Sequence, residues 1–188
     1  PEGWEADDVV NAYQWKSHLN YKKTGKHSHI IVTIDKDAFG TSGMIFNPFV
    51  DESTRVWKHP FPYLIDGFGS LTFKDGKVKG EGQIWLLLQC ILGDSSDDYS
   101  PTARLGVTGG DSLAYSLLAP CKTLREALEA VCKQYKEWFP EGVHFTSWDN
   151  SEQHLTWLEW ANIIFKCAYM VKGSNDTLTL TKLVERNG

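Results

Sequence analysis

The residues best suited to chemistry form three groups along the chain. Gly110-Asp-Ser-Leu113 carries a serine that could act as a nucleophile, and His27-Ser-His29 places two imidazoles on one face if the segment is extended. A third group, Asp94, Asp97 and Asp98, offers carboxylates of the kind that bind cations. The four cysteines form no Cys-x-x-Cys pair, so the sequence predicts neither a zinc ribbon nor a thioredoxin-like site.

The serine tetrapeptide resembles the first block of the GDSL (SGNH) hydrolases. Gly173-Ser-Asn-Asp176 resembles the block that supplies an oxyanion donor in that family. The resemblance implies Ser112 as the nucleophile and Asn175 as the donor. The family takes its general base from an Asp-x-x-His near the C-terminus, and no histidine follows Asp176 here. His144 or His154 could still reach the serine, since triads are defined by geometry. We therefore keep a serine hydrolase as an alternative, and we interpret the tetrapeptide as a turn.

The other two groups have simpler interpretations. His27 and His29 suit a strand entrance that faces solvent, because no carboxylate stands at a supporting spacing. The segment Gly93–Pro101 lacks the glycine and the terminal glutamate of an EF-hand, so we expect an exposed acidic loop. No P-loop and no Gly-x-Gly-x-x-Gly pattern is present, and the sequence predicts no cofactor and no metal.

Composition indicates one acidic domain spanning residues 1–188. The chain has 188 residues, a formal net charge of −5 and a pI near 5.7, which argues against a polyanionic partner such as nucleic acid. No apolar run is long enough for a membrane span, and no signal peptide is visible. The opening residues, PEGWEADD, are typical of a segment cut from a longer chain.

Short strands dominate the predicted secondary structure. Asp75-Gly76 between two alternating runs predicts a hairpin with a type I′ turn. Alternating, β-branched or continuously apolar runs predict further strands. The predicted strands cover residues 9–21, 29–34, 44–46, 55–58, 71–78 (the hairpin), 84–92, 103–108, 113–118, 142–148, 163–171 and 177–183. In the first of these, Val9 and Tyr13 also fit a helical spacing, and the strand is the preferred interpretation.

The clearest helix covers residues 123–139. Thr123 and Glu126 form a capping box, and an apolar stripe follows at helical spacing until Pro140. Residues 155–161 suit a helical turn, with a single helix over 155–170 as the competing interpretation. The predicted fold is therefore mainly β (α+β): an antiparallel β sandwich or barrel with one amphipathic helix (123–139) packed on it.

Eight tryptophans are a heavy load for a core of this size, so some of them are expected at a binding surface. Three lie among polar residues in the stretch from Trp148 to Trp160. No acid, base and nucleophile form a recognisable constellation, so the sequence favours a non-enzymatic recognition domain. The candidate binding residues are Trp148, Asp149, Asn150, Trp157, Trp160 and Tyr99.

In general character the chain resembles the projecting spike domains of non-enveloped virus capsids, such as those of astroviruses. The likeness rests on the runs IWLLLQCIL and IIFKCAYMV, the loops GDSSDDYSP and SWDNSEQ, and the clipped start. It implies a homodimer on the virion surface that binds a host receptor protein or glycan and meets antibodies. The alternative to the virion surface is a cytoplasmic location. A β-barrel that binds a small apolar ligand is a further alternative function.

Overall fold

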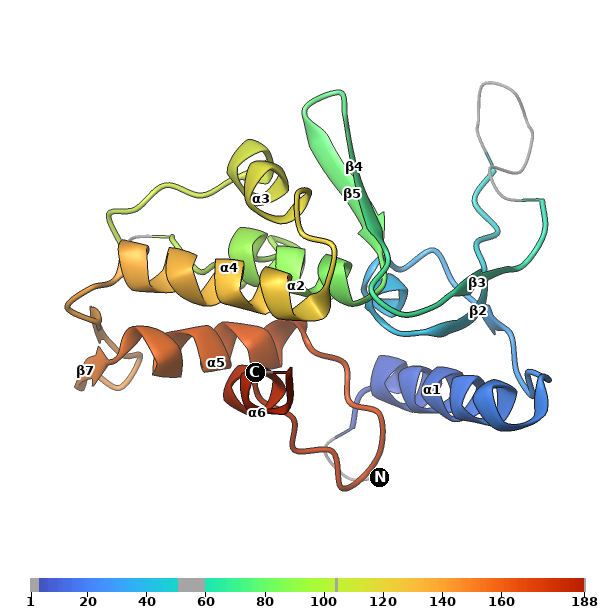
Figure 1. The fold of residues 1–188 in the computed structure, drawn as a ribbon. Helices are drawn as coiled ribbons and strands as arrows, with labels where there is room; N and C mark the ends of the chain where they lie inside the picture. Colours follow the sequence, from blue (N-terminus) through green and yellow to red (C-terminus); the bar gives the residue numbers. More distant parts are fainter. Residues whose placement is uncertain (1–3, 51–59, 104, 188) are drawn as a thin grey trace. The chain divides into compact units, whose positions relative to one another are not determined.

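The computed structural model describes residues 4–50, 60–103 and 105–187, and the chain forms two compact units (Figure 1). The first unit lies within Pro1–Ser70, Gly80–Trp85 and Met170–Asp176. The second lies within Leu71–Lys79, Leu86–Tyr169 and Thr177–Gly188. Each unit is described by itself below.

The predicted mainly β fold is wrong. The described residues are 44% helical and 17% strand, with six helices and sheets of only two or three strands. No sandwich or barrel closes within this part of the chain. The alternative function that depends on a β-barrel, the binding of a small apolar ligand inside it, is therefore not supported by the described residues.

Helix α1 (Ala6–Thr24) of the first unit replaces the strand predicted over residues 9–21. Glu5 and Asp8 form a capping box at its start, and Gly25 ends it with a left-handed φ of 71°. Its buried side chains are polar, and Gln14 Nε2 donates to the carbonyl oxygens of Ala38 (3.1 Å) and Thr41 (2.6 Å). The helix is thus held by side-chain hydrogen bonds, which apolar periodicity does not reveal.

The first unit also contains a three-stranded sheet, in the order β1 (Ile31–Val32), β2 (Gly43–Phe46), β3 (Tyr63–Ile65). β1 runs parallel to β2, and β3 runs antiparallel to it. A short 3-10 helix, η1 (Asp37–Gly40), connects β1 to β2. The core is made of Ile31, Ala38, Ile45 and Ile65. The strands predicted at 29–34 and 44–46 are confirmed in their centres, and the one predicted at 55–58 lies outside the described residues.

The predicted hairpin is confirmed as β4 (Ser70–Lys74) and β5 (Lys77–Glu81). Asp75 and Gly76 have φ angles of 53° and 75°, as a type I′ turn requires. On β5, the amide of Val78 donates over 2.9 Å to Oδ1 of Asp111, which belongs to the same unit.

Helix α2 (Gln83–Leu92) replaces the strand predicted over residues 84–92. Residues 84–91 are all buried and, apart from Gln89, all apolar, so the sequence carries no stripe of alternating apolar and polar faces. A continuous apolar run does not distinguish a buried strand from a buried helix. Leucine and glutamine favour the helix here.

Of two further helices in the second unit, one was predicted as a helix and the other was predicted as a strand. α4 (Leu124–Trp138) confirms the helix predicted over 123–139, and the Thr123 hydroxyl accepts from the amide of Glu126 at its N-cap. α3 (Asp111–Leu118) begins after Gly110 and replaces the strand predicted at 113–118. The strand predicted at 103–108 is a loop in its described part.

The C-terminal half of the second unit is also helical. β6 (Val143–Thr146) confirms the predicted strand at 142–148 and pairs with β7 (Glu152–Leu155). α5 (Trp157–Ala168) shows that the competing single helix over 155–170 was the correct interpretation, and the strand predicted at 163–171 is wrong. α6 (Leu180–Asn187) overturns the strand predicted at 177–183. α4, α5 and α6 pack against one another (Figure 1).

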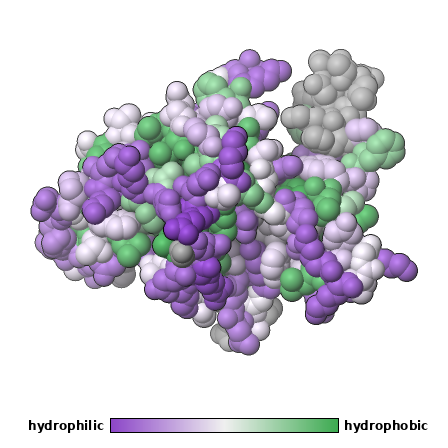
Figure 2. Space-filling model, viewed as in Figure 1, coloured by the Kyte–Doolittle hydropathy of each residue, from purple (hydrophilic) through white to green (hydrophobic). Residues whose placement is uncertain are grey.

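Polar side chains cover much of the face drawn in Figure 2, with apolar residues scattered between them. No helix among the described residues has the length and apolar character needed to cross a membrane.

Candidate functional site

The β6–β7 hairpin carries three of the residues predicted to bind a partner: Trp148, Asp149 and Asn150. Its strands pair in the register Val143 with Leu155 through Thr146 with Glu152, which leaves residues 147–151 as the connecting loop. His144 and His154 lie opposite each other, and their rings stack with centroids 3.9 Å apart. The pairing fixes the two ends of the loop.

Hydrogen bonds within the loop order its backbone. The amide of Ser147 donates to the carbonyl of Ser151 over 2.8 Å, and the amide of Asn150 donates to the carbonyl of Ser147 over 3.0 Å. Asn150 adopts a left-handed φ of 62°, which asparagine tolerates better than most residues. The loop is therefore a closed turn with a defined conformation.

Asp149 stabilises the same turn through its side chain. Its Oδ1 accepts from both the amide (3.0 Å) and the hydroxyl (2.6 Å) of Ser151. These hydrogen bonds lower the pKa of the Asp149 carboxyl, so it stays ionised at neutral pH. A fixed negative charge therefore stands next to Trp148 in the chain.

Trp148 is the most exposed large apolar side chain of the described residues, with 95% of its surface accessible. The other tryptophans in this part of the chain are buried or half-buried. Exposure of a whole indole leaves its apolar surface in water, which costs free energy that contact with a partner would recover. Trp148 is thus the side chain of the hairpin best placed to meet another molecule.

Trp160 serves the fold instead of the surface. Its indole Nε1 donates to the carbonyl of Pro101 over 2.9 Å, and its ring packs against Phe145 with centroids 5.8 Å apart. These contacts join α5 both to the loop after α2 and to the hairpin. Trp160 therefore positions the hairpin within the second unit.

Tyr99 and Trp157 complete the predicted set, and both are half-buried. Tyr99 exchanges two backbone hydrogen bonds with Asp94 (2.9 and 3.0 Å), and Trp157 is the first residue of α5. Among the described residues, no ring contact or hydrogen bond links either of them to Trp148. The structure thus separates the six predicted residues into an exposed turn and a packed base.

Ser112 lies exposed in the first turn of α3, so the tetrapeptide begins a helix and is not the turn expected for it. Its neighbour Asp111 is engaged elsewhere, since Oδ1 accepts from Val78 and Oδ2 lies 3.6 Å from Lys77 Nζ. In the described part of the chain, no histidine hydrogen-bonds to Ser112. His144 and His154, the two candidate bases, contact each other.

The two histidines of His27-Ser-His29 have different surroundings. His27 is half-buried and stacks on Tyr21, with centroids 4.2 Å apart, whereas His29 is exposed and its Nδ1 contacts the hydroxyl of Ser28. No group of three possible metal ligands among the described residues includes either of them.

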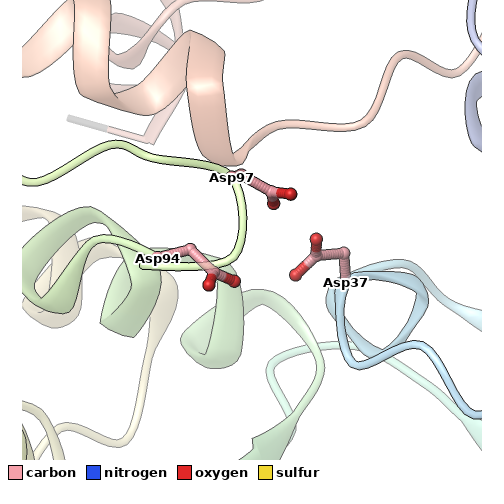
Figure 3. A group of neighbouring side chains, drawn as sticks. All are labelled: Asp37, Asp94 and Asp97. Atoms are coloured by element: carbon pink, nitrogen blue, oxygen red, sulfur yellow. The ribbon is translucent and has the colours of Figure 1, made fainter.

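The acidic loop after α2 is only partly exposed, which corrects the expectation of an exposed loop. Asp94 is 5% exposed, whereas Asp97 and Asp98 are exposed. Figure 3 shows Asp94 and Asp97 on this loop, and one carboxylate oxygen of each lies within 4.8 Å of the other. Asp94 Oδ1 accepts from the amide of Ser96 over 2.8 Å. Asp37, also drawn in Figure 3, belongs to η1 of the first unit.

A polar cluster in the first unit was missed at the sequence level. Asp66 Oδ1 lies 3.4 Å from Nε2 of the buried His18, and Asp66 Oδ2 accepts from Lys22 Nζ over 2.7 Å. The pKa of Asp66 is lowered chiefly by the bond from Lys22. His18 and Lys22 are four residues apart, so a helical interpretation of residues 9–21, extended by one residue, would have placed them on one face.

Comparisons with protein-family models, with curated proteins and with solved structures found no match to this chain.

Proposed function

We propose that the chain is a non-enzymatic recognition domain whose second unit binds a partner protein by inserting Trp148 into an apolar pocket of that partner. The observation that carries the proposal is the exposure of Trp148, 95%, at the turn of a closed hairpin. Tryptophan is among the residues that most often dominate the free energy of protein–protein binding.

The order of the turn supports the same role. The Asp149 carboxylate and the left-handed Asn150 fix the backbone next to the indole's attachment point. A side chain on a preformed turn loses less conformational entropy when it binds than one on an unordered loop. The hairpin therefore combines apolar contact area with preorganisation.

A protein partner fits this geometry better than a glycan. Saccharides and other small ligands bind in concave sites, with their rings stacked on aromatic faces and several polar groups converging on them. Trp148 stands on a hairpin turn, and the carboxylate next to it in the chain already accepts two hydrogen bonds from Ser151. The turn is thus suited to enter a cavity.

The likeness to capsid spikes rests in part on IWLLLQCIL and IIFKCAYMV as β runs. Because these runs lie largely in helices α2 and α5, that support is lost, and the proposal keeps the recognition role without the virion.

Selection of binders tests the proposal. The immobilised chain would be used to select from a displayed library of protein domains, and the affinity of each binder would be measured for wild type, Trp148→Ala and Phe61→Ala. Phe61 is a matched control, since it is 77% exposed and belongs to the first unit. We expect Trp148→Ala to weaken the dominant binders by about 30-fold or more and Phe61→Ala to leave them unchanged.

Two outcomes would contradict this proposal. Binders that tolerate Trp148→Ala as well as Phe61→Ala would remove the hairpin from the recognition surface. Trp148-dependent binding on a glycan array, with no such dependence among protein binders, would contradict the assignment of a protein partner.

A further inference from the structure

Strand β1 of the first unit and its flanking residues expose a row of aliphatic side chains. Ile30, Val32 and Ile34 are 50%, 63% and 67% exposed, whereas Ile31 between them is buried in the core. β1 itself covers only Ile31–Val32, but burial alternates from Ile30 through Ile34 as it does in an extended segment, so the three exposed side chains form one apolar face. This surface belongs to a different unit from Trp148.

β1 is also an edge strand in the part of the chain that the structure describes, since β2 lies on one side of it and no strand on the other. The amide of Thr33 donates to the carbonyl of Phe46 on β2 over 3.1 Å. Backbone polar groups alternate in direction along a strand, so the N–H and C=O of Val32 point to the open edge.

Nothing in the segment 30–34 discourages pairing at this edge. Proteins commonly protect an open edge with a lysine, a proline or a bulge, and these five residues are four aliphatic ones and a threonine. An uncharged edge with exposed aliphatic side chains favours the addition of a strand.

The sequence around Val32 is complementary to itself in the antiparallel direction. If Val32 lies opposite Val32 of a second copy, Ile30 lies opposite Ile34, and His29 lies opposite Asp35. Cross-strand partners project from the same face, so the aliphatic side chains contact each other and the imidazole meets a carboxylate. His29 and Asp35 are both exposed, although Asp35 Oδ1 already accepts from the amide of Asp37 and His29 Nδ1 contacts Ser28, so the pair would use Asp35 Oδ2 and His29 Nε2.

We propose that the chain forms a two-fold symmetric dimer in which β1 pairs antiparallel with β1 of a second copy, centred on Val32. The outward-facing backbone groups of the two Val32 residues form a hydrogen-bonded pair in this register, which agrees with the direction set by Thr33. Each copy supplies the same strand, as an isologous interface requires. The two three-stranded sheets then join in the order β3–β2–β1–β1–β2–β3.

Complementary charge variants test this register directly. His29→Asp places a carboxylate opposite Asp35 in both halves of the dimer, and Asp35→Lys places an ammonium opposite His29 in both halves. Sedimentation velocity at increasing concentration should show wild type dimerising and each single variant with a dissociation constant raised about tenfold or more. His29→Lys is the matched control, because it places an ammonium opposite Asp35 and should dimerise at least as well as wild type.

Mixing the two single variants distinguishes loss of dimerisation through charge repulsion from loss of dimerisation through misfolding. In a mixed dimer, the carboxylate introduced by His29→Asp in one copy faces the ammonium introduced by Asp35→Lys in the other, and the remaining pair is the natural one. We expect the mixture to recover dimers at the wild-type dissociation constant.

Three results would each overturn the dimer: a wild-type chain that stays monomeric at all concentrations, single variants that dimerise normally, or a mixture that stays monomeric. None of these results depends on Trp148, so the recognition proposal is tested separately.

Discussion

The Tyr135 hydroxyl donates a hydrogen bond to the backbone carbonyl of Cys90 over 2.6 Å. Tyr135 lies on α4 and Cys90 on α2, and both residues have no exposed surface. Burial and, to a smaller extent, the ionisable groups of Cys90, Tyr99 and Cys167 raise the pKa of Tyr135 well above its usual value, so the hydroxyl keeps its proton and donates at any ordinary pH. This bond ties two helices of the second unit together through its core.

Removing the hydroxyl should therefore destabilise the protein. We expect Tyr135→Phe to lower the free energy of unfolding by about 1–3 kcal/mol, because the Cys90 carbonyl loses its buried donor. Tyr13→Phe, at an exposed tyrosine of α1, should change it by less than about 0.5 kcal/mol. Urea unfolding of the three proteins measures the difference, and equal effects of the two substitutions would contradict the prediction.

The His18 cluster should make stability depend on pH. Burial lowers the pKa of His18 below 6.5, Asp66 opposes this effect, and the charges of Lys22, His27 and Lys172 reinforce it. Because the unfolded chain then binds a proton more readily than the native one, stability is complete above the unfolded pKa and falls as the pH drops below about 6.5. Burial lowers the pKa of His27 as well, with the same sign.

Thermal unfolding as a function of pH provides the measurement. We expect the midpoint of wild type to fall between about pH 7.5 and pH 5.5, and that of His18→Asn to fall less over the same interval. The variant should be the less stable protein at the higher pH, since it loses packing around a residue that is 4% exposed. An unchanged pH dependence in the variant would rule out His18 as its source.

The neighbouring carboxylates of Asp94 and Asp97 should repel each other. One oxygen of each lies within 4.8 Å of the other, and Asp94 is buried, where the interaction is screened less than in water. Asp97→Asn is therefore expected to raise the unfolding midpoint by a few degrees. Mg²⁺ or Ca²⁺ should raise the midpoint of wild type more than that of the variant, because divalent cations favour paired carboxylates.

Asp98→Asn is the control for this loop. It removes the same charge from an exposed residue with a left-handed φ of 53°, a conformation that asparagine also adopts. We expect little change in the midpoint or in its response to divalent cations. If both substitutions act alike, the effect belongs to net charge and not to the pair.

The start of α5 should depend on its capping box. The Thr156 hydroxyl accepts from the amide of Glu159 (3.3 Å), and Glu159 Oε2 accepts from the amide of Thr156 (2.8 Å). Thr156→Ala should cost about 1 kcal/mol in unfolding free energy, whereas Thr156→Ser should cost much less because serine caps equally well. Urea unfolding measures both, and similar losses for the two substitutions would show that the hydroxyl is not the stabilising group.

Local signals in the sequence were reliable where a few neighbouring residues decide the conformation. The turn at Asp75-Gly76 needs two residues with positive φ, and the helix after Thr123 has a cap, a stripe and a stop within one segment. Thr156 and Glu159 carry an equally local helix signal that was overlooked, and the alternation from Ile163 was followed instead. That error could have been avoided from the sequence.

Other elements could not be assigned from pattern alone. Residues 84–92 are apolar almost throughout, so the pattern of apolar residues does not distinguish a helix from a strand there. In α1, the buried and exposed side chains are the reverse of what an apolar pattern predicts: the helix exposes Tyr13 and Leu19 and buries Asn11, Gln14, Ser17 and His18. Its buried side chains donate to carbonyls distant in sequence, such as those of Met170 and Val171 for Asn11. A pattern based on apolar burial predicts the wrong face for such a helix.

The sequence by itself determined the helix over 124–138, the type I′ hairpin and the aromatic character of the segment from Trp148 to Trp160. Only the tertiary structure decided what each of those indoles does. Trp148 and Trp160 are the same residue type in the same polar stretch, yet one is almost fully exposed and the other donates to Pro101 and packs on Phe145. The exposure of a side chain depends on which distant backbone and rings come to lie beside it, and that is a property of the folded chain.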